Sequence, residues 1–274
     1  MIIKALSENT AVSDEFGSEH GLSLYIETAE KKFLFDVGAS PLFLKNAEKL
    51  GVNIADIDFL VISHGHYDHG GGLRAFLQKN SDAVVYLHHM AFEKHYAVRP
   101  NGEMEYIGLE EDLKKNSRIV PTLESTNISE GIRLFSNVSR REPVPASNNG
   151  LLAEHDGLVA ADSFSHEQNL VIEEGGKTLL VTGCAHNGIV NILEHFNYLT
   201  GHMPDYVIGG FHLYSRASGG NEDHETLDGI SKYLMGTKAK FFTCHCTGLV
   251  PYSRLKAGMG DRIDYLSAGS TIII

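Results

Sequence analysis

Cysteine is scarce in this 274-residue chain, which holds three. A small, odd number of cysteines gives no disulfide framework. No stretch approaches the roughly 20 consecutive apolar residues of a membrane-spanning helix. The apolar start, residues 1–6, is shorter than the hydrophobic region of a secretory signal and reads as a first strand. We therefore expect a cytoplasmic protein without a membrane partner.

Positive charge is also in short supply, because 35 acidic residues outnumber 23 basic ones and the net charge is −12. Nucleic-acid binding requires a basic stripe, and the densest basic points are only the pairs Lys114-Lys115 and Arg140-Arg141. We therefore expect no nucleic-acid partner. The negative field favours retention of divalent cations. An anionic small-molecule substrate, which we expect, would rely on bound metals and on local Arg or Lys.

Several common catalytic motifs are missing. The chain has no Gly-x-Ser-x-Gly, no Walker loop and no Gly-x-Gly-x-x-Gly after a strand. It also has no Pro/Ser-rich linker or break in composition, so we predict one domain over residues 1–274. The sequence gives no indication of the oligomeric state.

The informative stretch is H-x-H-x-D-H at residues 64–69, which follows the apolar run 59–62 and precedes three glycines. It predicts a ligand loop at the end of a buried strand. His64 and His66 point the same way in extended backbone and can share one ion, while Asp68 and His69 can hold a second. Imidazole and carboxylate suit transition metals. We predict one or two divalent ions, with zinc favoured and iron, manganese or nickel as alternatives.

This motif resembles that of the metallo-β-lactamase superfamily, and residues 32–38 and 176–183 are similar to two of its strands. The resemblance implies an α/β fold, the αβ/βα four-layer sandwich, with two sheets between layers of helices. Residues 19–23, 182–186, 209–213 and 245–248 resemble one subfamily. That subfamily carries the label of a dihydropterin-methyl-ribofuranosyl-aminobenzene-phosphate synthase.

Further metal ligands are predicted at the ends of later strands. His186 ends an apolar strand before a helix, and Cys184, two residues earlier, faces the same side in extended backbone. The superfamily often has a bridging Asp at this place, so Cys184 is either a metal ligand or a small buried residue. His245 follows another apolar strand, and strand alternation puts Cys244 and Cys246 on the opposite side from it.

The remaining candidates have other roles. Asp68 both binds metal and orients the attacking water, and His212 competes with His245, so that one ligates metal and the other acts as an acid or oxyanion donor. His20 is expected to contact substrate. His166 is assigned to substrate binding, with a place among the metal ligands as the alternative. Asp36 is expected to support a ligand histidine rather than to bind metal.

The leading functional hypothesis is hydrolysis of an ester, lactone, thioester or phosphoester by a metal-activated hydroxide at a dinuclear site. The alternatives are the pterin and aryl-ribosyl-phosphate transfer that the subfamily label implies, redox chemistry, and metal binding without turnover. Residues 98–118 are interpreted as a loop. Residues 139–166 are interpreted as a longer loop that covers the substrate.

Overall fold

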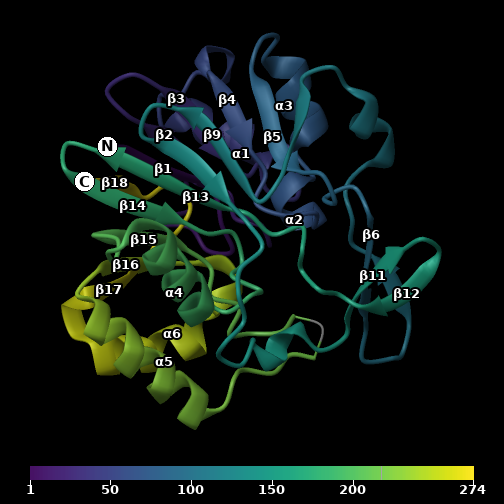
Figure 1. The fold of residues 1–274 in the computed structure, drawn as a ribbon. Coiled ribbons are helices and arrows are strands. Elements are labelled where there is room, and N and C mark those ends of the chain that lie inside the picture. The colour runs from purple at the N-terminus through teal and green to yellow at the C-terminus, as the bar shows by residue number, and fades with distance from the viewer. Residues whose placement is uncertain (217) are drawn as a thin grey trace.

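The computed structural model describes residues 1–216 and 218–274. Two seven-stranded sheets face each other, and helices cover the outer face of each sheet (Figure 1). The αβ/βα four-layer sandwich predicted from the sequence is therefore confirmed. Among the described residues, no helix is both long and apolar enough to cross a membrane.

The first sheet is antiparallel at one side and parallel at the other. In spatial order it contains β18 (Thr271–Ile273), β1 (Ile2–Ser7), β2 (Ser23–Glu27), β3 (Lys32–Phe35), β4 (Phe59–Val61), β5 (Val84–His88) and β8 (Ile119–Thr122). The strands β3, β4, β5 and β8 run parallel. Their carboxyl ends consequently meet at one edge of the sheet.

The second sheet repeats this plan. It contains β17 (Ile263–Tyr265), β16 (Lys240–Thr243), β15 (Tyr206–Gly209), β14 (Lys177–Val181), β13 (Asn169–Glu174), β10 (Ile132–Phe135) and β9 (Ser125–Ser129). The strands β14 to β17 run parallel. Ligands of open α/β sheets bind outside the carboxyl ends of such strands, and two edges of this kind are present here.

Apolar faces hold the layers together. A core with Leu24, Val61 and Val181 fills the space between the two sheets. The first sheet also packs on the helices α1 (Leu42–Lys49) and α3 (Leu73–Lys79) through residues such as Phe43 and Phe76. The second packs on α4 (Ile189–Thr200), α5 (His224–Thr237) and α6 (Leu249–Met259). Each fully buried Leu, Val or Phe side chain contributes about 1.5–3 kcal/mol.

Short helical turns complete the chain: α2 (Tyr67–Gly70), η1 (Ile54–Asp56), η2 (Glu111–Lys115), η3 (Ala146–Asn148), η4 (His245–Thr247) and η5 (Gly260–Arg262). Gly51 follows α1 in the left-handed conformation, with φ of 68°, which ends the helix. Asp223 caps α5 by accepting a hydrogen bond from the backbone N–H of Thr226 at 2.8 Å.

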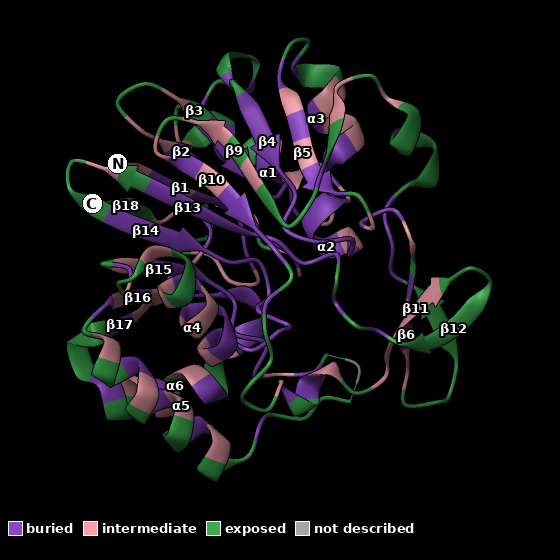
Figure 2. Ribbon diagram, in the orientation of Figure 1, coloured by how far each residue is buried: buried purple, intermediate pink, exposed green. Residues whose placement is uncertain are grey.

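A third sheet corrects the interpretation of residues 98–118 and 139–166 as loops. Its strands are β12 (Leu158–Ala161), β11 (Leu151–His155), β6 (Lys94–Val98) and β7 (Met104–Tyr106). It projects from one side of the sandwich (Figure 2). The strands β12 and β7 are exposed along their length. Because neither face of these strands is buried in the main core, their sequences lack the alternation that identifies a half-buried strand.

Candidate metal centre

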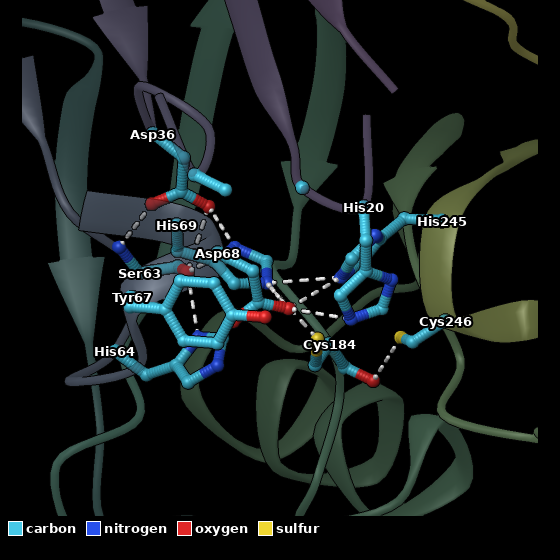
Figure 3. Close-up of polar contacts among 12 residues, drawn as sticks. His20, Asp36, Ser63, His64, Tyr67, Asp68, His69, Cys184, His245 and Cys246 are labelled. Atoms are coloured by element: carbon cyan, nitrogen blue, oxygen red, sulfur yellow. Dashed lines mark hydrogen bonds and ion pairs between the residues drawn. The ribbon is translucent and has the colours of Figure 1, made fainter. Parts of the chain in front are cut away.

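Loops from both large sheets meet at the carboxyl ends of the parallel strands. Asp36 follows β3 and residues 63–69 follow β4, while Cys184 follows β14 and His245 follows β16. The structure thus brings together residues as far apart in the chain as Asp36 and His245, which are 209 positions apart. Asp36 contacts Ser63 in the 63–69 loop, and His69 of the same loop contacts His245 (Figure 3).

Three histidines form the first group of ligand atoms. His64, His66 and His186 each offer a ring nitrogen within 4.8 Å of the others. All three Nε2 atoms are buried and without a hydrogen-bond partner among the described residues. An unsatisfied buried polar atom costs about 1–3 kcal/mol. Three such atoms directed at one point fit a divalent metal ion, which neutral imidazole binds well.

The second group consists of Asp68, His69 and His245. Asp68 Oδ2 lies 3.2 Å from His245 Nε2 and 3.8 Å from His69 Nε2, and the two Nε2 atoms are 3.2 Å apart. Ligands of a tetrahedral zinc ion, bound at about 2.0–2.2 Å, lie about 3.3–3.6 Å from one another. The spacing of these three atoms therefore suits a second ion.

Hydrogen bonds on the outer side of the rings fix the orientation of the histidines. The Nδ1 atom of His64 contacts Ser63 Oγ at 2.8 Å, that of His186 contacts Asn148 Oδ1 at 2.9 Å, and that of His245 contacts Asn9 Oδ1 at 2.8 Å. An amide oxygen only accepts, so the Nδ1 atoms of His186 and His245 carry the proton. Their Nε2 lone pairs then face the centre of the site, as metal ligation requires.

Asp36 lies behind the second group and contacts it through Ser63 and His69. Its carboxylate accepts hydrogen bonds from the backbone N–H of Ser63 at 2.6 Å and from Ser63 Oγ at 2.8 Å, and it contacts His69 Nδ1 at 2.6 Å. Burial disfavours the charged form of His69, but Asp36 and Asp68 outweigh this and raise its pKa to about 9. Burial likewise opposes ionisation of Asp68, yet His69, His20 and His245 hold the pKa of its carboxyl well below the usual range.

Cys184 occupies a position between the two groups. Its Sγ atom is 3.1 Å from His69 Nε2. It forms a possible ligand set with His64 and His69, and another with His186 and His212. Of the two roles that the sequence left open, the structure places the sulfur among the ligand atoms rather than in an apolar core.

His212 lies on the side of the first group. Its ring is 4.1 Å from that of His186, centroid to centroid, and both of its ring nitrogens are buried without a partner among the described residues. His245 lies in the second group. The two histidines that competed for one role are thus at different places in the site, and His212 is free to bind a ligand or to donate a proton.

His20 lies at the entrance, where its Nε2 is 3.2 Å from Asp68 Oδ2. The pocket above the ligand atoms is lined by His20, Tyr67, Arg99, Ser147, Leu151 and Arg216, among others. Ser147 and Leu151 belong to the segment 139–166, so part of that segment does border the pocket. Its interior, however, forms strands rather than an open loop.

His166 lies next to the His64–His66 loop. It is buried and lies outside the pocket lining; its Nδ1 accepts a hydrogen bond from the backbone N–H of Gly65 at 2.9 Å. Its Nε2 contacts Asp162 Oδ2 at 3.1 Å, as does His95 Nδ1. His166 thus packs behind the His64–His66 loop, and it forms a possible ligand set with His66, His95 and Asp162, which fits the alternative place among the metal ligands. No sequence pattern pointed to His95 or Asp162.

The cysteines near His245 correct a second prediction. The strand β16 ends at Thr243, and residues 245–247 form the turn η4, with φ of 52° at His245. Strand alternation therefore does not continue through the motif. Cys246 Sγ lies with Cys184 and His245 in one possible ligand set, so the prediction that Cys246 faces the side opposite His245 was wrong. Cys244 does face away, into the core between the sheets.

The fold and the ligand set define a class of protein, and comparison with known families agrees. The model of the metallo-beta-lactamase superfamily matches residues 17–217. The chain belongs to this superfamily of metal-binding proteins, and it is an enzyme.

Three individual proteins are similar to this chain over nearly its whole length. The chain is 30% identical to the 7,8-dihydropterin-6-methyl-4-(beta-D-ribofuranosyl)-aminobenzene-5'-phosphate synthase of Methanocaldococcus jannaschii, over 98% of this chain and 95% of that protein. A structure described as Tm1679, a metal-dependent hydrolase of the beta-lactamase superfamily, has a TM-score of 0.85 and 30% identity, covering 100% of this chain and 99% of that one. Zn(2+)-bound PqqB from Methylobacterium extorquens, with 13% identity, 100% coverage of both chains and a TM-score of 0.59, shares the fold.

Proposed function

We propose that this enzyme is a metal-dependent hydrolase that acts on an ester, lactone, thioester or phosphoester of an anionic small molecule. The observation that carries the proposal is the inward direction of the histidine Nε2 atoms. Outer hydrogen bonds hold the rings of His186 and His245, and the Nε2 atoms of His64 and His66 are buried without partners. A buried centre built in this way fits cations rather than an organic ligand.

The residues divide into two ligand groups, and Cys184 lies between them. His64, His66 and His186 would hold one divalent ion, and Asp68, His69 and His245 would hold the other. Ions bound there would supply Lewis-acid polarisation of a substrate oxygen and activation of a water molecule at neutral pH. Zinc is favoured because imidazole, carboxylate and thiolate together suit it.

Other side chains supply proton transfer and orientation. Asp68 has its second oxygen available to accept a hydrogen bond from a nucleophilic water, while Oδ2 faces His20 and His245. His212, whose nitrogens have no partner among the described residues, is placed to donate a proton to a leaving group or to stabilise a developing oxyanion. His20 contacts Asp68 Oδ2 on the side of the pocket entrance.

Charge at the pocket entrance supports an anionic substrate. The lining contains Arg216, Arg99, which is paired with Glu105 outside the lining, and, among the described residues, one carboxylate, that of Asp68. This is unlike the chain as a whole, whose net charge is −12. Arg216 Nη1 donates to the hydroxyl of Tyr67 at 3.2 Å, which leaves the Tyr67 proton for an acceptor. Phosphate and carboxylate groups match such an arrangement of donors.

A transferase is the second candidate, and the relative with 30% identity over 98% of the chain favours it. In that case the nitrogen of an arylamine ribosyl phosphate would attack the methylene carbon of an activated pterinylmethyl unit. The C–O bond to a pyrophosphate or phosphate leaving group would break, and the amine would lose a proton. The same ligand groups would then hold phosphate oxygens of the substrates, and the arginines would face the remaining phosphate.

Metal analysis of anaerobically purified protein, coupled to a substrate panel, tests the proposal. We expect up to two transition ions per chain, turnover of at least one phosphoester, lactone or thioester, and loss of both metal and turnover in His186→Ala. His202→Ala is the matched control, since this exposed histidine lies between α4 and β15. Metal-replete protein that hydrolyses nothing in the panel, but joins a dihydropterin to an aryl-ribosyl phosphate, would replace the hydrolase with the transferase.

A further inference from the structure

Two buried sulfur atoms lie beside the second ligand group. Cys184 Sγ is 3.1 Å from His69 Nε2. Cys184 Sγ, Cys246 Sγ and a ring nitrogen of His245 all lie within 4.8 Å of one another (Figure 3). The exposed fraction is 2% for Cys184 and 4% for Cys246, so both thiols are removed from solvent.

The backbone holds the sulfur of Cys246 at this place. The turn η4, entered through the left-handed conformation of His245, directs both of these residues toward the centre. A Cβ atom at Gly210 would lie 2.4 Å from Cys246 Sγ, so a larger residue at position 210 would displace the sulfur. The backbone N–H of His212 donates to the same Sγ at 3.3 Å. The Sγ atom in turn lies 3.5 Å from the carbonyl oxygen of Cys184, to which it donates, so contacts on two sides fix its position.

Cys244 shows what an ordinary buried cysteine looks like in this chain. It is fully buried in the apolar core between the two sheets. Free cysteines behave there as small hydrophobic residues. Cys246, two residues later, instead has Cys184, His245 and the backbone of His212 around it. The different surroundings of the two thiols argue against a purely packing role for Cys246.

We propose that Cys246 is a metal ligand, and that together with Cys184 it makes the Asp68–His69–His245 position a mixed nitrogen, oxygen and sulfur site. With bonds of about 2.3 Å to sulfur and about 2.0 Å to nitrogen, the ligand atoms of one tetrahedral zinc ion lie about 3.5–3.8 Å apart. The ligand atoms of Cys184, Cys246 and His245 all lie within 4.8 Å of one another, and Asp68 or His69 would supply the fourth ligand. Soft thiolates select zinc or iron over magnesium, calcium or manganese. The inference rests on the metal site of the proposed function and is independent of the reaction.

Cobalt(II) substitution tests this ligation directly, because thiolate ligands produce charge-transfer absorption in the near ultraviolet. We expect the absorption in the wild-type protein, a partial loss in Cys246→Ala, a partial loss in Cys184→Ala and a complete loss in the double variant. Cys244→Ala is the matched control and should keep the full absorption. Equilibrium dialysis on the same samples gives the cobalt bound per chain, and circular dichroism checks the fold.

A measurement on the wild-type protein removes the dependence on variants. Cadmium-113 NMR of the loaded protein should show one resonance shifted downfield as expected for two sulfur ligands. The inference is overturned if that resonance indicates fewer sulfurs, if Cys246→Ala keeps the full cobalt absorption, or if no cobalt binds. Cobalt binding without thiolate charge-transfer bands would refute ligation by Cys184 and Cys246 but not the metal site. A lack of turnover in protein that shows these bands would refute only the proposed hydrolysis.

Discussion

Replacement of Asp36 by asparagine tests how much the carboxylate that contacts His69 Nδ1 contributes to metal affinity. Asparagine has the same shape and tolerates the φ of 62° at this position. Its amide oxygen can still accept from the backbone N–H of Ser63. The amide nitrogen cannot accept, however, so the hydrogen bonds that Asp36 Oδ2 accepts from His69 Nδ1 at 2.6 Å and from Ser63 Oγ at 2.8 Å are lost. His69 then loses the partner that fixes its tautomer and raises its basicity.

Loss of a carboxylate behind a metal-ligating histidine lowers metal affinity by about 10–100-fold, which corresponds to about 1.4–2.7 kcal/mol. For Asp36→Asn we expect a loss of this size for one of two bound ions, the one held by Asp68, His69 and His245. The His64–His66–His186 position should change less, because its links to Asp36 run only through Ser63.

Zinc titration in competition with a chromophoric chelator measures both affinities. Asp56→Asn provides the matched control, since this exposed carboxylate lies in η1 of the same half of the molecule. Circular dichroism of the metal-free variant establishes that it is folded. Unchanged zinc affinity in folded Asp36→Asn would refute the assigned role, as would selective loss of the ion at the three-histidine position.

Two further predictions concern stability. Gly65→Ala would place a methyl group 2.3 Å from the carbonyl oxygen of Ala91, so denaturant unfolding should show a free energy of unfolding lower by about 1–3 kcal/mol. In the control Gly229→Ala, in α5, the added methyl group has no neighbour within 4 Å, and the free energy of unfolding should rise by up to about 1 kcal/mol. Equal effects of the two substitutions would refute the packing argument. Burial, with His89 nearby, lowers the pKa of His88 to about 4 from 6.5. The neutral ring therefore stabilises the fold above pH 6.5 and loses this effect as the pH falls toward 4, so His88→Gln should flatten that part of the stability profile, whereas parallel profiles would contradict it.

The strands that carry the site were predictable because they are buried on both faces. Residues 59–62 and 179–181 are continuous apolar runs, and such runs are typical of parallel strands between layers of helices. The H-x-H-x-D-H spacing after the first of them indicated metal chemistry by its residue types alone. His186 and His245 were found in the same way, since each follows an apolar run that corresponds to β14 or β16.

The third sheet could not be predicted in this way. Its strands β7 and β12 are exposed throughout, so hydrophobic periodicity does not mark them. Asp162, which follows β12, was missed for the same reason, although its carboxylate joins His95 and His166 behind the metal loop. Contacts between residues this far apart in the chain depend on the complete fold rather than on any local pattern.

Side-chain direction at the site follows from backbone conformations that no local sequence pattern indicates. Asp36, Ala185, His212 and His245 have φ values of 62°, 56°, 50° and 52°. Each lies just beyond a parallel strand, and for residues with a Cβ atom this conformation costs about 1–2 kcal/mol. Strain of this kind persists where surrounding contacts fix the backbone. At His245 they include the hydrogen bond from its N–H to the buried Glu8 at 2.6 Å. A sequence can therefore indicate which residues reach the metal centre, whereas these strained turns decide which way Cys246 and its neighbours point.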